Sequence, residues 1–194
     1  ADVDVELVYR APETFDLEAM AALVTEAVAE KPAGLIVSIP NSDALARPIQ
    51  AAVAAGIPVI SINSGFDVGP ALGALLHVGQ SEYEAGRVAG DAMRKAGGSK
   101  ALCLNHELGN VGLDLRCKGF IDGFAGSVEV MAVVTDPAEV KTAVAERLEA
   151  DAEFDVILAL NATIAGAPAV EAAKALAERK VRVATFDVTD AVLN

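Results

Sequence analysis

Residues 34–65 read GLIVSIPNSDALARPIQAAVAAGIPVISINSG, and this stretch decides the fold class. Its first part, from Gly34 to Ile39, is a continuous apolar run, which is typical of a strand covered on both faces. Ser42 or Asp43 is expected to cap the helix that follows. A second apolar run then extends from Ile57 to Ile62. Strand, helix and strand in this order predict a right-handed crossover between neighbouring strands of a parallel sheet.

The segment before this unit is expected to hold one more strand and one more helix. Apolar and polar side chains alternate from Val3 to Tyr9, which predicts a half-buried strand. Asp16 can cap a helix whose apolar stripe runs from Leu17 to Val28. The chain therefore alternates strands and helices from its first residues.

The same rhythm continues to the end of the chain. A short strand is expected around Leu76 to Val78, and a helix from Ser81 to Ala96 stops at a pair of glycines. Further strands are expected at Ala101–Asn105, Val128–Val134, Val156–Leu160 and Val181–Phe186, with helices near 110–125, 137–150 and 164–178. The total of about eight strands exceeds a sheet of about five and suits two incomplete parallel sheets. Because the chain starts in a strand and stops just after a helix start at Thr189, we expect it to be a fragment.

Composition excludes several classes of function. The chain has 194 residues and a net charge of -13, whereas nucleic acids and anionic membranes require clustered Lys and Arg. Apolar runs stay well short of the roughly 20 residues that span a bilayer. We therefore expect no nucleic-acid partner and no direct membrane insertion.

The two cysteines leave their redox state open. Cys103 is expected near the end of a strand and Cys117 on the next helix, and the two can come level because a helix rises more slowly than a strand. A disulfide and two buried free thiols are both compatible with this placement.

Short polar side chains follow nearly every predicted strand. In an open parallel sheet, ligands bind beyond the carboxyl ends of the strands. Neutral amides and hydroxyls at these ends suit a sugar, because each sugar hydroxyl both donates and accepts hydrogen bonds. Asp187 could accept from two neighbouring hydroxyls, an Arg could donate two bonds, and Phe186 could cover an apolar ring face. The same residue types also populate ordinary strand-to-helix turns.

Four stretches resemble the ribose-binding-like periplasmic receptors of ABC transporters, a family of type I periplasmic binding proteins. Residues 34–65 resemble the family's strand–helix–strand passage, and HVGQSEYEAGRVAGD (77–91) resembles its first hinge crossing with the next helix. LNHELGNVGLDLRCKGF (104–120) resembles the opening of the second lobe, and VRVATFDVT (181–189) resembles a late strand. The resemblance implies two doubly wound α/β lobes, both incomplete here, which close on one sugar in the cleft between them.

The resemblance also implies lobe boundaries and ligand contacts. Residues 1–79 would be part of the N-terminal lobe and 80–194 most of the C-terminal lobe, with the first hinge crossing near 79–81. The implied ligand-binding residues are Ser38, Asn63, Ser64, Gln80, Glu107, Arg116, Asn161, Phe186 and Asp187. Asn63-Ser64 stands where ribose binders carry Asp-Arg, so a hexose or an open-chain polyol fits at least as well as ribose. The family's first strand and helix and its last two hinge crossings have no counterpart.

The resemblance implies a binding function rather than catalysis. We expect a monomer that carries a sugar or polyol to an ABC permease, in the periplasm or secreted or lipid-anchored after removal of a signal peptide. Neither a cofactor nor a metal is expected, since no second His follows His106-Glu107 at helical spacing and no nucleophile elbow, phosphate loop or dinucleotide loop is present. His77 is expected to be structural. The alternative is the effector-binding domain of a lactose-repressor-type transcription regulator, which shares this fold.

Overall fold

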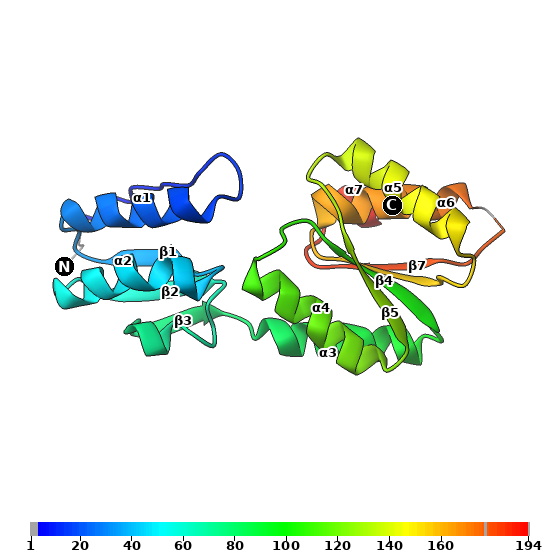
Figure 1. The fold of residues 1–194 in the computed structure, drawn as a ribbon, viewed down its shortest axis with the longest axis horizontal. Coiled ribbons are helices and arrows are strands. Elements are labelled where there is room, and N and C mark those ends of the chain that lie inside the picture. Colours follow the sequence, from blue (N-terminus) through cyan, green and yellow to red (C-terminus); the bar gives the residue numbers. More distant parts are fainter. Residues whose placement is uncertain (1–3, 177, 194) are drawn as a thin grey trace. The chain divides into compact units, whose positions relative to one another are not determined.

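Strands and helices alternate from Leu17 to Leu193 in the computed structural model, which describes residues 4–176 and 178–193. The chain divides after Gly79 into two compact units, Ala1–Gly79 and Gln80–Asn194, hereafter unit 1 and unit 2. Each unit contains its own parallel sheet (Figure 1). The predicted α/β class with two parallel sheets is therefore confirmed.

Unit 1 contains a three-stranded sheet covered by two helices. Its elements are α1 (Leu17–Ala29), β1 (Leu35–Ser38), α2 (Ser42–Ala54), β2 (Val59–Asn63), the short 3-10 helix η1 (Pro70–Leu72) and β3 (Leu76–Gly79). The strands are parallel in the order β1-β2-β3. Apolar side chains of both helices pack on the strand residues Val37 and Val59 to form the core of the unit.

Two helix caps in unit 1 test the sequence reasoning. Asp16 caps α1 as predicted, because its carboxylate accepts a bond from the backbone N–H of Ala19. The prediction of Ser42 or Asp43 as the cap of α2 is wrong. Asn41 is the cap, since its backbone is extended and its side chain accepts from Ala44 N. Residues 41–43 are all of types that commonly cap helices, and the first of them, Asn41, is the N-cap.

Two predictions about strands in unit 1 are also wrong. No strand forms over the described part of the segment from Val3 to Tyr9, and Leu7 and Tyr9 are 80% and 85% exposed; Val3 lies outside the described residues. An alternating segment becomes a strand only beside a partner, and β1 pairs only with β2 in the described chain. The Gly34–Ile39 run is not covered on both faces, because Ile36 is 57% exposed.

Unit 2 contains a four-stranded parallel sheet with helices on both faces. Its elements are α3 (Glu82–Lys95), β4 (Lys100–Asn105), α4 (Val111–Phe124), β5 (Ser127–Ala132), α5 (Pro137–Ala150), β6 (Val156–Ala159), the π-helix η2 (Ala162–Gly166), α6 (Ala167–Ala175), β7 (Arg182–Thr185) and α7 (Asp190–Leu193). The strand order is β5-β4-β6-β7. The total over the described residues is thus seven strands, not eight.

Alternation along the central strands builds two cores in unit 2. Leu102 and Leu104 of β4 face α5 and α6, whereas Ala101 and Cys103 of the same strand face Phe120 on α4. Successive strand side chains point to opposite faces, so one strand supplies both cores. This doubly wound arrangement leaves the carboxyl ends of β4, β6 and β7 next to one another at one edge of the sheet.

The segment after β6 differs from its prediction. One helix was expected over 164–178, but η2 occupies Ala162–Gly166 and α6 begins only at Ala167. Asn161 caps η2, because its side-chain oxygen accepts bonds from the backbone N–H groups of Thr163 and Ile164. Because Asn161 caps it, the helical turn begins almost directly after the strand. Turns of π-helix are often found at functional sites.

Candidate functional site

Four of the predicted ligand residues of unit 2 lie at adjacent strand ends. Glu107 follows β4, Asn161 follows β6, and Phe186 and Asp187 follow β7. Because β4, β6 and β7 are consecutive neighbours in one parallel sheet, these residues share one edge. This edge, together with Arg116 of α4, is hereafter called the unit 2 site.

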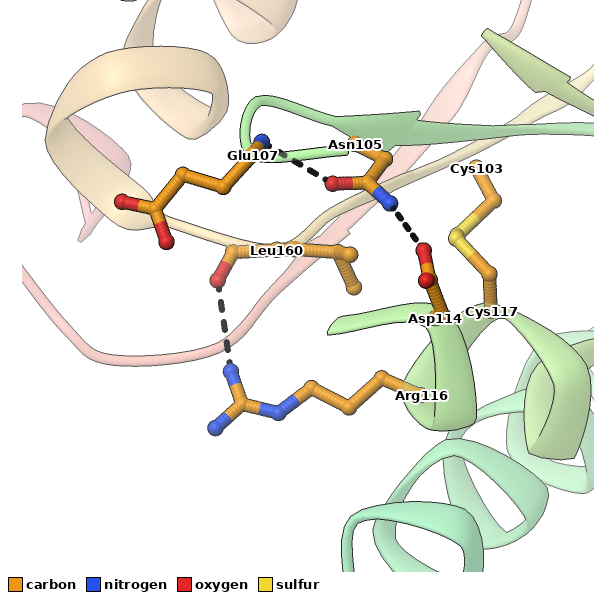
Figure 2. The surroundings of a disulfide bond; sticks show 7 residues. All are labelled: Cys103, Asn105, Glu107, Asp114, Arg116, Cys117 and Leu160. Atoms are coloured by element: carbon orange, nitrogen blue, oxygen red, sulfur yellow. Dashed lines mark hydrogen bonds between the residues drawn. A yellow bond between two sulfur atoms is a disulfide. The ribbon is translucent and has the colours of Figure 1, made fainter. Parts of the chain in front are cut away.

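Arg116 is the most constrained side chain of the unit 2 site. Its side chain is only 13% exposed, and its Nε donates to Oε2 of Glu82, a carboxylate that is 5% exposed. Nη1 donates to the backbone carbonyl of Leu160 at 3.4 Å, the contact drawn in Figure 2. The guanidinium lies over the Phe186 ring, 4.4 Å from its centroid. A cation over a ring face and an ion pair together hold the guanidinium at the end of β6.

Asn161 and Asp187 supply amide and carboxylate groups. The side-chain oxygen of Asn161 accepts from Thr163 N and Ile164 N, and its Nδ2 group takes no part in these bonds. Asp187 is exposed and has a left-handed backbone, with φ at 67°. Such a conformation costs about 1 kcal/mol or more for a non-glycine residue and is found mostly at turns and functional sites.

The loop after β4 is organised by its own side chains. Asn105 accepts from the backbone N–H of Glu107 at 3.0 Å and donates to Asp114 at 2.8 Å (Figure 2). Oε2 of Glu107 in turn accepts from Asn110 Nδ2 at 2.8 Å. The carboxylate of Glu107 is therefore oriented by the loop that carries it, and its side chain is 27% exposed.

His106 belongs to this loop, and its surroundings favour the neutral imidazole. Burial lowers the pKa of His106 below the usual histidine value, the Glu107 carboxylate opposes this, and the Arg116 guanidinium adds to the lowering. Its Nδ1 is buried without a hydrogen-bond partner. The described residues offer no group of three or more acidic, histidine or cysteine side chains that could hold a metal ion.

A disulfide joins β4 to α4 behind the unit 2 site. Cys103 and Cys117 are bonded, with their Cα atoms 5.9 Å apart, and both sulfurs belong to the core beneath α4 (Figure 2). This result decides between the two states that the sequence left open. The bond ties the helix that carries Arg116 to the strand that carries the Glu107 loop.

The predicted ligand residues of unit 1 also follow strands. Ser38 ends β1, Asn63 ends β2, and Ser64 comes next. Asn63 is exposed with φ at 58°, whereas Ser64 is buried and its backbone carbonyl accepts from Ile39 N. The neighbouring strands β1 and β2 bring Ser38 and Asn63 to the same edge of this sheet.

Gln80, the remaining predicted ligand residue, and His77, which is expected to be structural, lie near the division between the units. Gln80 is exposed, and its side-chain amide donates to Oε2 of Glu82 at 3.3 Å. Nδ1 of His77 lies 2.9 Å from the Ser61 hydroxyl, and its ring meets Phe66 edge-on. These contacts fit the structural role predicted for His77.

Sequence reasoning missed Glu82 and the helix contact that places it. Helices α3 and α4 run side by side in unit 2 (Figure 1). A Cβ at Gly86 would overlap the carbonyl oxygen of Arg116, and one at Gly119 would overlap that of Tyr83. The signal was present, because each helix carries two glycines four residues apart, Gly86 with Gly90 and Gly119 with Gly123.

Comparison with known proteins identifies the family to which the chain belongs. The family model of the periplasmic binding protein domain matches residues 1–194. No curated protein sequence gave a match. Over residues 4–176 and 178–193, each helix is too short or too polar to span a bilayer.

Solved structures resemble the chain over most of its length. One is a carbohydrate transporter protein from Acidothermus cellulolyticus 11B in complex with myo-inositol, at 37% identity and a TM-score of 0.84, covering 89% of this chain and 60% of that one. Another is a periplasmic sugar-binding protein of an ABC sugar transporter from Legionella pneumophila, at 23% identity and a TM-score of 0.80, covering 94% and 70%. A solute-binding protein from Burkholderia graminis C4D1M in complex with D-arabinose has 19% identity, a TM-score of 0.82 and coverage of 95% and 66%.

The last two structures support the fold alone, whereas the first is similar in sequence as well. The chain spans about 60% of the length of that first relative. With the family model matched from end to end, the chain belongs to the periplasmic binding protein domain family.

Proposed function

We propose that the chain is part of a two-lobed receptor that captures a sugar or polyol and delivers it to an ABC permease without chemical turnover. The observation that carries this proposal is the unit 2 site, where the Arg116 guanidinium lies over Phe186 at the edge that also holds Asn161 and Asp187. A guanidinium, an amide and a carboxylate together can both donate to and accept from ligand hydroxyls. The ring of Phe186 adds an apolar surface.

The proposed ligand class is a cyclic sugar or polyol, with myo-inositol as the first candidate. The relative with 37% identity was crystallised with myo-inositol. Asn63 and Ser64 give the unit 1 edge neutral side chains, which fits a ligand rich in hydroxyls and without charge. The absence of an Asp-Arg pair at these two positions argues against ribose itself.

The two units correspond, in this proposal, to the two lobes. Unit 1 would be part of the N-terminal lobe, unit 2 most of the C-terminal lobe, and residues 79–81 the first hinge crossing. Each lobe would supply ligand contacts, Ser38, Asn63 and Ser64 from the first, and Gln80, Glu107, Arg116, Asn161, Phe186 and Asp187 from the second. The ligand then favours the closed form only through its extra contacts there. The relatives' greater length supports a longer natural protein that completes both lobes.

The proposed location is outside the cytoplasm, in the periplasm or on the cell exterior. The Cys103–Cys117 disulfide supports this location, because disulfides persist in oxidising compartments and are rare in the cytosol. Family membership supports it independently. The receptor would act there as a monomer that docks on its permease.

A melting-temperature screen of the full-length protein against pentoses, hexoses and polyols tests the proposal. A ligand that binds only the folded state raises the melting temperature with its concentration. We expect at least one sugar or polyol, myo-inositol first, to raise it. The proposal fails if none of them does.

Calorimetric titration with the selected ligand then tests the residues. Asp187→Ala is expected to weaken binding more than Ser38→Ala, because a carboxylate can accept from two hydroxyls and its bonds are charge-assisted, worth about 1.5–3 kcal/mol each. The reverse order would contradict the assignment of Asp187 to the ligand.

A further inference from the structure

We propose that Glu82 is a positioning residue for ligand binding, which holds the Arg116 guanidinium over Phe186 so that Arg116 can donate to ligand hydroxyls. The inference rests on the proposed function, since it requires a ligand at the unit 2 site. Glu82 belongs to α3, which supplies none of the predicted ligand contacts, and Arg116 lies 34 residues further along the chain.

The close approach of α3 and α4 brings the two side chains together. Where Gly86 faces Arg116 and Gly119 faces Tyr83, the two helices touch backbone to backbone, with no room for a Cβ. Glu82 lies one turn before Gly86, and Arg116 lies one turn before Gly119. The pair therefore lies at the same end of the glycine contact, and the helix packing sets its separation.

Burial of the Glu82–Arg116 ion pair restricts Arg116 to one side-chain conformation. The Glu82 side chain is 5% exposed and that of Arg116 is 13% exposed. A buried carboxylate is strongly disfavoured unless it is paired and hydrogen-bonded, so Glu82 requires the guanidinium where it is. An exposed pair at this place would instead allow Arg116 many rotamers.

The bonds of Arg116 leave part of the guanidinium for a ligand. Nε is committed to Glu82 and Nη1 to the Leu160 carbonyl, while Nη2 takes part in neither bond. A guanidinium presents its five N–H donors in one plane. Fixing Nε and Nη1 therefore also fixes the direction in which Nη2 can donate.

Glu82 also connects the site to the start of unit 2. The same oxygen, Oε2, accepts from the side-chain amide of Gln80 at 3.3 Å. Gln80 is the first residue of unit 2. One buried carboxylate thus holds both Arg116 and Gln80, two of the residues proposed to contact the ligand.

Calorimetric titration of the full-length protein with myo-inositol and D-arabinose as probes tests the inference. Glu82→Gln keeps the shape and one acceptor oxygen but removes the charge, and about fivefold to tenfold weaker binding is expected. Glu82→Ala is expected to weaken binding about tenfold to hundredfold. Glu84→Gln is the matched control, because Glu84 lies on the same helix in an exposed pair with Arg87 and should leave affinity unchanged.

A double-mutant cycle separates positioning from a general effect on folding. Arg116→Ala alone should weaken binding about hundredfold, and adding Glu82→Gln to it should cost less than about twofold more. A merely structural role for Glu82 predicts the same loss with and without Arg116. That equal loss would overturn the inference, as would unchanged affinity of both single Glu82 variants.

The outcomes for the two proposals are distinct. If the unchanged protein binds neither these probes nor any ligand of the melting screen, the proposed function fails and this inference fails with it. If the unchanged protein binds a ligand and the Glu82 variants bind it equally well, only the inference is overturned. Because Glu82→Gln is isosteric, it remains a usable test even if Glu82→Ala does not fold.

Discussion

Gly119→Ala tests the backbone contact that places Arg116. An added Cβ would overlap the Tyr83 carbonyl oxygen and lie 2.9 Å from the backbone nitrogen of Arg87, so α3 and α4 must separate. Alanine in place of glycine would by itself stabilise a helix by about 1 kcal/mol. Overpacking costs about 1–3 kcal/mol, and a backbone-to-backbone collision belongs at the upper end. We therefore expect a net loss of about 2 kcal/mol in the free energy of unfolding.

Urea unfolding followed by circular dichroism measures this loss. Gly34→Ala is the control, because its Cβ would meet only the Pro58 carbonyl oxygen, at an ordinary contact distance of 3.7 Å. That variant should stay within about 0.5 kcal/mol of the unchanged protein. Gly119→Ala should also bind ligand less tightly, because separated helices loosen the Glu82–Arg116 pair. If Gly119→Ala is as stable as the unchanged protein, the reasoning about the helix contact is refuted.

Three further predictions concern stability. Changing Cys103 and Cys117 to Ser opens a loop of 14 residues and should cost about 3 kcal/mol in urea unfolding, whereas equal stability in reducing and oxidising buffer would contradict a structural disulfide. Burial opposes ionisation of Asp155, but bonds from the backbone N–H groups of Lys100 and Ser99 lower its pKa overall. The ionised carboxylate therefore stabilises the folded state above about pH 4, and this stabilisation disappears as the pH falls. Asp155→Asn should for this reason destabilise the protein more at pH 7 than at pH 3. Burial lowers the pKa of His106, so its NMR titration should have a midpoint below about 6.5 and stability should fall with pH below that value; a midpoint above it would contradict the burial.

The sequence predicted unit 2 better than unit 1 for a physical reason. The runs that became β4 and β6 are buried on both faces by helices of the same unit, so pattern and environment agree. In unit 1, Ile36 and Ile62 have the same apolar character but are 57% and 38% exposed, because both helices cover the other face of the sheet. An apolar run indicates a strand but does not show how many layers lie on it.

The alternating segment at the start of the chain illustrates the same limit. Its pattern fits a strand, yet Leu7 and Tyr9 stay exposed because no neighbouring strand of the described chain pairs with them. A strand forms only when a second segment pairs with it, and the sequence of the first segment alone does not show whether that partner is present.

The residues of the candidate site that directly follow strands could be predicted from the sequence. Asn161, Phe186 and Asp187 follow β6 and β7 as the pattern of short polar residues after strands indicates. The partner of Arg116 was not predictable from that pattern, because Glu82 meets it across two helices. That pairing depends on how closely α3 and α4 approach each other. In the sequence, only the glycines spaced four residues apart on each helix indicate this close approach.

The most direct test is a crystal structure of the full-length protein with the ligand that the melting screen selects. We expect ligand hydroxyls within about 3 Å of Arg116 Nη2, the Asn161 amide and the Asp187 carboxylate, with the ring of Phe186 against the sugar. A ligand bound away from the carboxyl ends of β6 and β7, with these three side chains in water, would contradict the account.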